Sequence, residues 1–164
     1  MEYANLPITG AYAITPTIFK DNRGQLLRLI DCTDVLQVNE SHTYTVGTFR
    51  GIHYQPGMRK IVKCLLGRVL DIIVDLRRDS PTYLQNYKTI LYDGQQILLY
   101  IPPGCGHGVL SLSDHSRLLY FLNTQWNPTL EGGVRWDDPA LNLDLPFPPV
   151  LLSEKDRSFP DWVP

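Results

Sequence analysis

Short runs of Val, Ile, Leu, Tyr and Thr alternate with turn residues along most of this chain, and helical periodicity is hard to find. Turn sequences such as Asp93-Gly94 and Pro102-Pro103-Gly104 separate the runs and favour chain reversals. We predict strands at 11–19, 48–54, 60–65, 68–76, 87–92, 96–101, 108–111 and 117–123. The pattern is typical of an all-β sandwich or barrel, and 164 residues suit one domain, 1–164.

The stretch 68–76 has apolar residues on both of its alternating faces, which predicts a central strand in a two-layer structure. Asp71 and Asp75 fall on the same face. One of them could point into an interior cleft, but a solvated face is the simpler interpretation.

The composition changes after about residue 127, where seven of the 13 prolines lie and strand-like runs become few. The aromatic residues and leucines of this Pro-rich segment predict that it is ordered and packed on the barrel.

Charges nearly cancel, with 15 Lys and Arg against 17 Asp and Glu, and no basic run stands out. Binding to nucleic acid or to a membrane surface through bulk charge is therefore not expected. The first residues lack the basic start and apolar run of a signal peptide. Lys63, Arg68 and Asp71 interrupt the longest apolar stretch, 61–76, which excludes a membrane span there.

The three cysteines, Cys32, Cys64 and Cys105, are odd in number and share no short-spacing motif. We therefore expect three reduced thiols in a cytoplasmic protein. None has a sequence neighbour that marks it as a nucleophile, although Cys105 lies in a Gly-rich turn beside His107.

Motifs for metal, phosphate or nucleophilic chemistry are scarce. The sequence has no His-x-His pair, no zinc-type cysteine–histidine cluster, no Gly-x-Ser-x-Gly and no phosphate-binding glycine loop. Spacing alone leaves open a metal site of two histidines and a carboxylate, for example His53, His107 and Asp71. We treat it as a minority alternative.

The remaining chemistry lies in isolated proton-handling groups on strands. Taken alone, His53 is a core histidine, His107 stabilises a turn, Tyr120 is a core aromatic and Lys60 is solvated. Arg50, however, shares a strand with His53, and Lys60 begins the next strand. Clustered cations are unfavourable unless an anion or a developing negative charge lies among them. This suits proton abstraction beside a carbonyl on an anionic substrate, with an imidazole as base.

At these residues the chain resembles the dTDP-4-dehydrorhamnose 3,5-epimerase family, which consists of cupin-type jelly-roll enzymes of nucleotide-sugar metabolism. The resemblance covers about 19–156. It rests on the motifs FKDNRG, QVNES, FRGIHYQ, KIVKCLLGRVLDIIVDLRRDSPTY, IPPGCGHGVLSLSD, LLYF, GGVRWDDPAL and LSEKD. The resemblance implies a cupin-like jelly roll and an isomerase that inverts C3, C5 or both in a nucleotide-linked 4-keto sugar.

The resemblance also implies roles for individual residues. His53 would remove the proton beside the C4 ketone, Asp156 would orient His53, and Tyr120 would reprotonate the opposite face. Lys60, with help from His107, would stabilise the enolate. Contacts to the diphosphate and nucleotide are implied for Arg23, Arg50 and Lys155, and other substrate contacts for Phe19, Gln37, Asn39, Trp126 and Glu131.

The implied assembly is a homodimer that exchanges N-terminal strands, and the implied chemistry needs neither metal nor organic cofactor. Several departures from the family pattern lie around substrate recognition. Arg28 stands near the place of a glutamate that helps bind the nucleotide, Gln125-Trp126 replaces a Tyr-Tyr pair, and the segments 24–37 and 53–60 are shorter. The nucleotide, the sugar and the number of inverted centres therefore stay open.

Two other functions remain as alternatives. Arg28 and the shortened loops fit a non-catalytic jelly-roll protein that binds a sugar nucleotide. The second alternative is a metal-dependent cupin enzyme.

Overall fold

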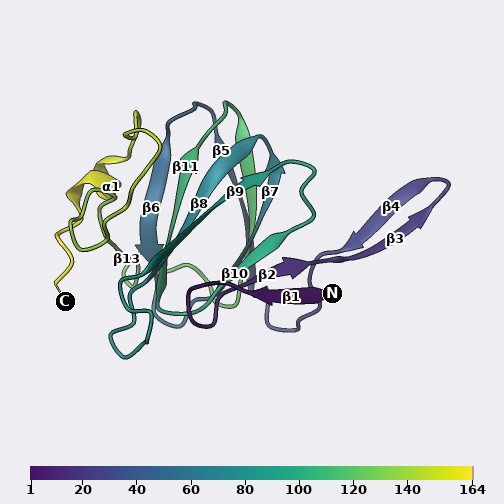
Figure 1. Ribbon diagram of the computed structural model, residues 1–164, viewed down its shortest axis with the longest axis horizontal. Coiled ribbons are helices and arrows are strands. Elements are labelled where there is room, and N and C mark those ends of the chain that lie inside the picture. The colour runs from purple at the N-terminus through teal and green to yellow at the C-terminus, as the bar shows by residue number, and fades with distance from the viewer. Residues whose placement is uncertain (164) are drawn as a thin grey trace.

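Two antiparallel sheets face each other in the computed structural model, which describes residues 1–163 (Figure 1). The six-stranded sheet has the order β1 (Glu2–Asn5), β2 (Tyr12–Thr15), β10 (Leu98–Ile101), β7 (Lys60–Leu66), β12 (Ser116–Leu122) and β5 (Gln37–Thr43). The five-stranded sheet has the order β13 (Gly132–Gly133), β6 (Phe49–Tyr54), β11 (Cys105–Ser111), β8 (Arg68–Asp75) and β9 (Asn86–Tyr92). The prediction of an all-β, cupin-like jelly roll is confirmed.

The main core fills the space between the sheets. Val62, Leu99 and Leu118 of the six-stranded sheet pack there with Ile73 and Val109 of the five-stranded sheet. Strand β8 lies between β11 and β9 and has apolar side chains on both faces, as predicted for a central strand.

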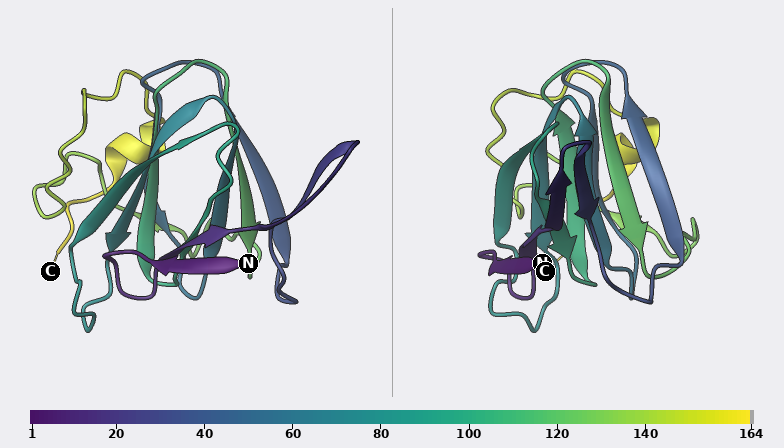
Figure 2. Two further views of the ribbon diagram at one scale, coloured as in Figure 1. Left: turned by 45° about the vertical axis from the view of Figure 1, so that its right-hand side comes forward. Right: turned by 90° about the vertical axis from the view of Figure 1, so that its right-hand side faces the viewer.

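A second core lies on the outer face of the five-stranded sheet. The Pro-rich C-terminal segment and its short helix, α1 (Glu154–Ser158), lie on this side of the molecule (Figures 1 and 2). Leu141, Trp136 and Trp162 of this segment pack with Ile72 and Val74 of β8. The contact explains why both faces of β8 are apolar.

The prediction of a single strand over 11–19 is wrong. The stretch 11–19 is not one strand but two, β2 and β3 (Thr17–Asp21), with Pro16 between them. Proline has no backbone N–H for a sheet ladder, so the chain leaves the six-stranded sheet at this residue.

Strands β3 and β4 (Gly24–Arg28) form a hairpin that projects away from the two sheets (Figures 1 and 2). Within residues 1–163 this hairpin pairs with no other strand. None of the helices in that range is long and apolar enough to cross a membrane.

Asp71 and Asp75 are both fully buried, so the solvated-face interpretation is wrong. Asp71 accepts a hydrogen bond from His107. Asp75 accepts hydrogen bonds from Arg77, Ser80 and Thr82. Burial alone would raise the pKa of Asp75, but these donors lower it to about 2.

Candidate active site

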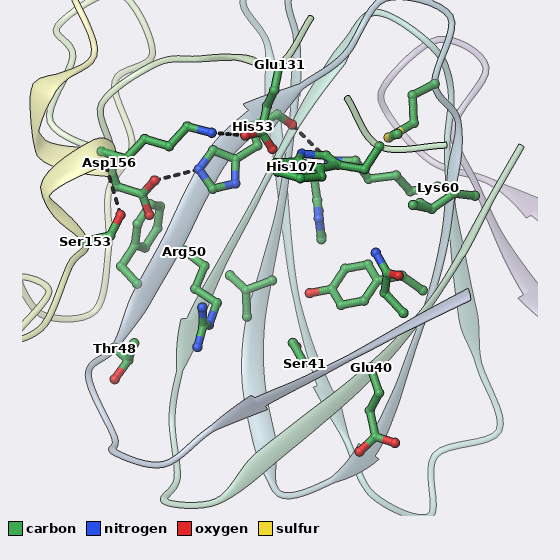
Figure 3. A pocket seen from close by; sticks show the side chains of 18 of the residues that line it. Glu40, Ser41, Thr48, Arg50, His53, Lys60, His107, Glu131, Ser153 and Asp156 are labelled. Carbon is green, nitrogen blue, oxygen red and sulfur yellow. Dashed lines mark hydrogen bonds and ion pairs between the residues drawn. The ribbon is translucent and has the colours of Figure 1, made fainter. Parts of the chain in front are cut away.

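A cavity of about 920 Å³ opens between the two sheets (Figure 3). It is lined by all of the predicted site residues except Phe19, Arg23 and Gln37, namely His53, Lys60, Tyr120, Asp156, Asn39, Arg50, His107, Trp126, Glu131 and Lys155. Strand pairing explains part of this convergence. His107 of β11 lies opposite His53 of β6, and Tyr120 of β12 lies opposite Asn39 of β5.

His53 is held by a buried carboxylate. Its Nε2 lies 2.6 Å from Oδ1 of Asp156, whose Oδ2 accepts from the backbone N–H of Gly51 at 3.3 Å. Burial would raise the pKa of Asp156, but the hydrogen bonds and charge of His53 outweigh it and lower that pKa. The ionised carboxylate binds the Nε2–H of the ring, which leaves Nδ1 as the basic nitrogen.

Helix α1 brings Asp156 to this position. Ser153 is its N-cap, and the Ser153 side chain accepts a hydrogen bond from the backbone N–H of Asp156 at 3.0 Å. The sequence Ser-x-x-Asp at 153–156 is therefore a helix-capping pattern, and this pattern marks Ser153 as a residue that helps to position Asp156.

Lys60 points into the cavity and is only partly exposed, contrary to the solvated position expected for it in isolation. Its Nζ donates to the backbone carbonyl of His53 at 3.0 Å. Burial lowers the pKa of Lys60 to about 8, although the negative charge of Asp71 opposes this shift. The amine therefore changes charge close to physiological pH.

His107 belongs to strand β11 rather than to a turn, and its Nε2 lies 2.8 Å from Oδ2 of Asp71. The Oδ1 atom of Asp71 is buried and finds no hydrogen-bond partner among residues 1–163. The ring of His107 packs edge-on against that of Tyr120, with centroids 6.0 Å apart. Burial raises the pKa of Tyr120 well above its usual value, partly opposed by a hydrogen bond to Ser41, so the phenol stays protonated.

The cavity holds two further cations in different states. The Arg50 guanidinium donates to Thr43 Oγ1 at 3.2 Å and to the His42 carbonyl at 3.3 Å, and within residues 1–163 it has no carboxylate partner. Lys155, in contrast, forms an ion pair with Glu131. Arg50 is thus the cation more readily available to a ligand.

Three predicted site residues lie elsewhere. Phe19 and Arg23 are on the projecting hairpin, where Arg23 pairs with Asp21 and the Arg28 guanidinium lies 5.5 Å from the Phe19 ring centroid. Gln37 begins β5 but bonds to the backbone N–H of Trp126 at 2.8 Å.

A metal site from His53, His107 and Asp71 does not assemble, because the two histidines pair with different carboxylates. Among residues 1–163, no three His, Cys, Asp or Glu side chains lie together in a group that could hold a metal ion. Burial raises the pKa of Cys105 to about 12, so this thiol is protonated near neutral pH and is a poor nucleophile.

The cavity therefore combines a carboxylate-held imidazole, a protonated phenol and a buried amine. Such a set can take a proton from a carbon beside a carbonyl, stabilise the enolate and supply a new proton.

Comparison with known proteins gives one consistent result. The family model described as dTDP-4-dehydrorhamnose 3,5-epimerase matches residues 5–163. The dTDP-4-dehydrorhamnose 3,5-epimerase of Pseudomonas aeruginosa is 34% identical over 169 residues, covering 96% of this chain and 93% of that protein. The dTDP-4-dehydrorhamnose 3-epimerase of Streptomyces niveus is 36% identical over 170 residues, covering 96% and 82%.

Solved structures agree with the sequence relatives. A dTDP-4-dehydrorhamnose 3,5-epimerase from Bacillus anthracis, crystallised with TDP and PPi bound, has a TM-score of 0.91 and 30% identity. The match covers 98% of this chain and 99% of that one. The chain belongs to the dTDP-4-dehydrorhamnose 3,5-epimerase family of nucleotide-sugar epimerases.

Proposed function

We propose that the protein is a cofactor-independent epimerase of a nucleotide-diphosphate-linked 4-keto sugar. In this reaction Nδ1 of His53 removes the proton from the carbon beside the C4 ketone, and Asp156 stabilises the imidazolium that forms. Lys60, when charged, stabilises the enolate oxygen together with His107. Tyr120 then donates its proton to the opposite face of the same carbon, which inverts that centre.

The observation that carries this proposal is the meeting of a paired imidazole and a protonated phenol in one cavity. A protein that only binds a sugar nucleotide needs neither group. Arg50, without a carboxylate partner, suits the substrate diphosphate. The TDP and PPi in the Bacillus anthracis relative support a nucleotide substrate of this kind.

The proposal is tested by following solvent deuterium into 4-keto sugar nucleotides with different bases. We expect incorporation at C3, C5 or both with inversion, and none with the His53→Ala variant. Tyr120→Phe should still exchange the proton, because His53 returns a deuteron to the same face, but it should not invert the carbon. Absence of exchange across the whole panel would sink the proposal.

The number of inverted centres follows from the same measurement. Both a 3,5-epimerase and a 3-epimerase are among the relatives, at similar identity. Deuterium at C3 alone would define a single epimerisation, whereas deuterium at both carbons would define a double one.

The proposal includes a homodimer that exchanges strands. Because β1 and β2 pair within their own sheet, the hairpin β3–β4 is the part of the N-terminal region available for exchange. A lone two-stranded hairpin is marginally stable, and β5 offers an unpaired sheet edge. If the hairpin paired with β5 of a second copy, the hairpin would be stabilised and the open sheet edge would be covered.

Exchange also explains two implied substrate contacts. Phe19 and Arg23 lie on the hairpin and do not line the cavity of their own chain, so they could touch substrate only in a partner's cavity. A cytoplasmic location completes the proposal and is supported by three cysteines that form no disulfide.

A further inference from the structure

A smaller cavity of about 150 Å³ lies over the outer face of the six-stranded sheet and shares no lining residue with the catalytic cavity. One side of it is formed by the segment 29–36, which joins β4 to β5. Cys32 and Asp34 of this segment line the cavity, as does Arg59, which directly precedes β7. This group of a thiol, a carboxylate and a guanidinium has no part in the proposed epimerisation.

Two segments that are shorter than the family pattern meet here. Arg59 lies in the segment 53–60, and both Cys32 and Asp34 lie in the segment 24–37. The Nε of Arg59 donates to Oδ2 of Asp34 at 3.3 Å, and its Nη2 forms an ion pair with the same carboxylate. Nη2 also lies 3.6 Å from the Cys32 sulfur. The contact therefore lies outside the motifs by which the chain resembles its family.

The Arg59 guanidinium is buried but incompletely satisfied. Only 6% of the residue is exposed, and its Nη1 has no hydrogen-bond partner among residues 1–163. Asp34, its carboxylate partner, has a side chain that is 60% exposed. An ion pair with so exposed a carboxylate is weak, because water competes for its charge. A second carboxylate brought to the cavity can therefore take the place of Asp34.

Cys32 is the accessible thiol of the chain. It is exposed, whereas Cys64 and Cys105 are buried. Burial raises the pKa of Cys64 to about 11 and that of Cys105 to about 12, so both thiols are protonated near neutral pH. Thiol–disulfide exchange requires a thiolate that the reagent can reach. Exchange is therefore expected at Cys32 and not at the two buried thiols.

We propose that Cys32 is a modification site for low-molecular-weight disulfides that carry carboxylates, such as oxidised glutathione, and that a carboxylate of the resulting mixed disulfide binds Arg59 in competition with Asp34. The site goes beyond the proposed function and does not depend on it. A guanidinium pairs with a carboxylate through two parallel hydrogen bonds, which is the arrangement that Asp34 now uses. Each glutathione supplies two carboxylates for the same arrangement.

The exchange step needs no further reactant. Cys32 releases its thiol proton to solvent, and the thiolate attacks one sulfur of the glutathione disulfide. A bond forms between Sγ and that sulfur, while the original sulfur–sulfur bond breaks and the second glutathione leaves as a thiolate that takes a proton from solvent. Cys32 is oxidised, and the departing glutathione is the reduced product. An exposed mixed disulfide of this kind is readily reversed by a reducing thiol.

Modification also displaces the segment 29–36. The cavity of about 150 Å³ is smaller than the roughly 300 Å³ of small ligand pockets, so a bound tripeptide does not fit there with the segment in place. Loss of the Asp34 contact removes the ion pair between the segment and Arg59. Because the segment joins the hairpin β3–β4 to β5, its release loosens the connection between them.

Mass spectrometry identifies the modified residue. After incubation of the whole protein with oxidised glutathione near neutral pH, we expect one adduct per chain, located at Cys32. Dithiothreitol should remove it, and Cys32→Ser should not form it. No adduct on the wild-type protein, or an adduct on Cys64 or Cys105 of the folded chain, would overturn the proposal.

A comparison of oxidised glutathione with cystamine, a small disulfide that carries amines and no carboxylate, tests the role of Arg59. We expect Arg59→Met to lower the equilibrium constant for the glutathione adduct about fivefold, and not to lower that for the cystamine adduct. Exposed Arg68 on the other sheet is the control, and Arg68→Met should change neither constant. An equal loss for both disulfides, or no loss for glutathione, would refute the binding of its carboxylate by Arg59.

Competition with Asp34 makes a prediction of opposite sign. Asp34→Asn frees Arg59, so the equilibrium constant for the glutathione adduct should rise about fivefold. Asp31→Asn is the matched control, because it removes a charge from the same exposed segment, and it should change the constant by less than about twofold. Equal gains in the two variants, or no gain in Asp34→Asn, would refute the competition. Because Asp34 is exposed, this variant supplies the decisive data if Arg59→Met does not fold.

Displacement of the segment has its own readout. Arg28 ends β4 and directly precedes the segment, and trypsin cleaves after arginine. We expect cleavage after Arg28 to be at least about fivefold faster in the glutathione adduct, and unchanged in glutathione-treated Cys32→Ser. An adduct that is cleaved no faster than the unmodified protein would refute the displacement. None of these measurements uses a sugar nucleotide, so their outcome is separate from that of the proposed function.

Discussion

Lys60 couples activity to pH in a way that sets it apart from an ordinary lysine. Its pKa is lowered to about 8 by burial, so Nζ loses its charge as the pH rises through that value. The neutral amine stabilises an enolate poorly, and we therefore expect kcat/KM for proton exchange to fall above about pH 8. Lys60→Arg is the control, since a guanidinium stays charged and should remove this alkaline loss. Full wild-type activity at pH 10 would contradict the assignment.

The loss of charge on Lys60 that lowers activity has the opposite effect on stability, because it raises the free energy of unfolding. An unfolded lysine keeps its proton up to its ordinary pKa of 10.5, whereas the folded protein releases it near 8. Between these values the unfolded state binds more protons, so the free energy of unfolding rises with pH. The enzyme is therefore expected to gain stability from Lys60 in the range where it loses activity.

The pairing of His53 with Asp156 makes a second prediction. Asp156→Asn removes the carboxylate that accepts from Nε2 and stabilises the imidazolium, so we expect the exchange rate to fall at least about a hundredfold. Deuterium incorporation measured at saturating substrate would show this fall. Ser153→Ala is the matched control because it removes only the cap of α1, at a cost of about 1 kcal/mol in stability. Equal losses in the two variants would mean that Asp156 acts only through the fold.

The site residues that could be predicted from the sequence are those that belong to a recognisable motif or lie close together in the chain. Arg50, His53 and Lys60 lie close together in the chain, and their shared charge pointed to an anionic substrate. The partnership of Asp71 with His107 depends on the register between β8 and β11, which no local pattern reveals. For the same reason Lys60 looked solvated until the two sheets were placed together.

At the level of single elements, Asp75 organises the connection between β8 and β9. Its carboxylate binds Arg77, Ser80 and Thr82, and Thr82 also bonds Thr9 in the turn between β1 and β2. We expect Asp75→Asn to lower the free energy of unfolding by about 3 kcal/mol, measured by urea denaturation. Exposed Asp79 in the same connection is the control, and Asp79→Asn should change stability by less than about 0.5 kcal/mol.

Acid titration extends this prediction. The pKa of the Asp75 carboxyl is about 2 in the folded protein, whereas its ordinary value in an unfolded chain is 3.8. As the pH falls, the unfolded state therefore takes up the proton first. The contribution of Asp75 to stability is present above about pH 4 and disappears as the pH approaches 2. The Asp75→Asn variant should lack this acid-dependent loss, and an identical acid profile in both proteins would refute the assignment.

Strand prediction succeeded where apolar alternation is strong and failed for strands that are mostly polar or exposed. Strand β5, Gln37–Thr43, has polar residues at most positions because one face lines the cavity, and it was not predicted. Strands β1 and β4 were also missed, and both are largely exposed at an edge or on the hairpin. Apolar periodicity reports burial within one chain, so it is weak for strands that lack such burial.

At the scale of the whole molecule, a third apolar cluster lies on the outer face of the six-stranded sheet. Ile14, Ile61 and Leu98 form an apolar cluster with Tyr12 and Tyr100 beside them. Because Ile14, Ile61 and Leu98 are almost fully buried within the chain itself, this cluster contributes to the fold and offers little apolar surface to a second copy.

Strand exchange predicts that two inactive variants restore each other. His53→Ala lacks the base but keeps its hairpin, whereas the Phe19→Ala/Arg23→Ala double variant keeps the base but has a defective hairpin. If each hairpin serves the partner's cavity, a mixed dimer contains one cavity with both an intact base and an intact hairpin. Random mixing should then recover about a quarter of wild-type activity, because half of the dimers are mixed and each has one working site. If the hairpin instead serves its own chain, no cavity in the mixture is complete and no activity should return. Sedimentation of the separate variants as dimers supplies the control, because complementation requires subunits that associate.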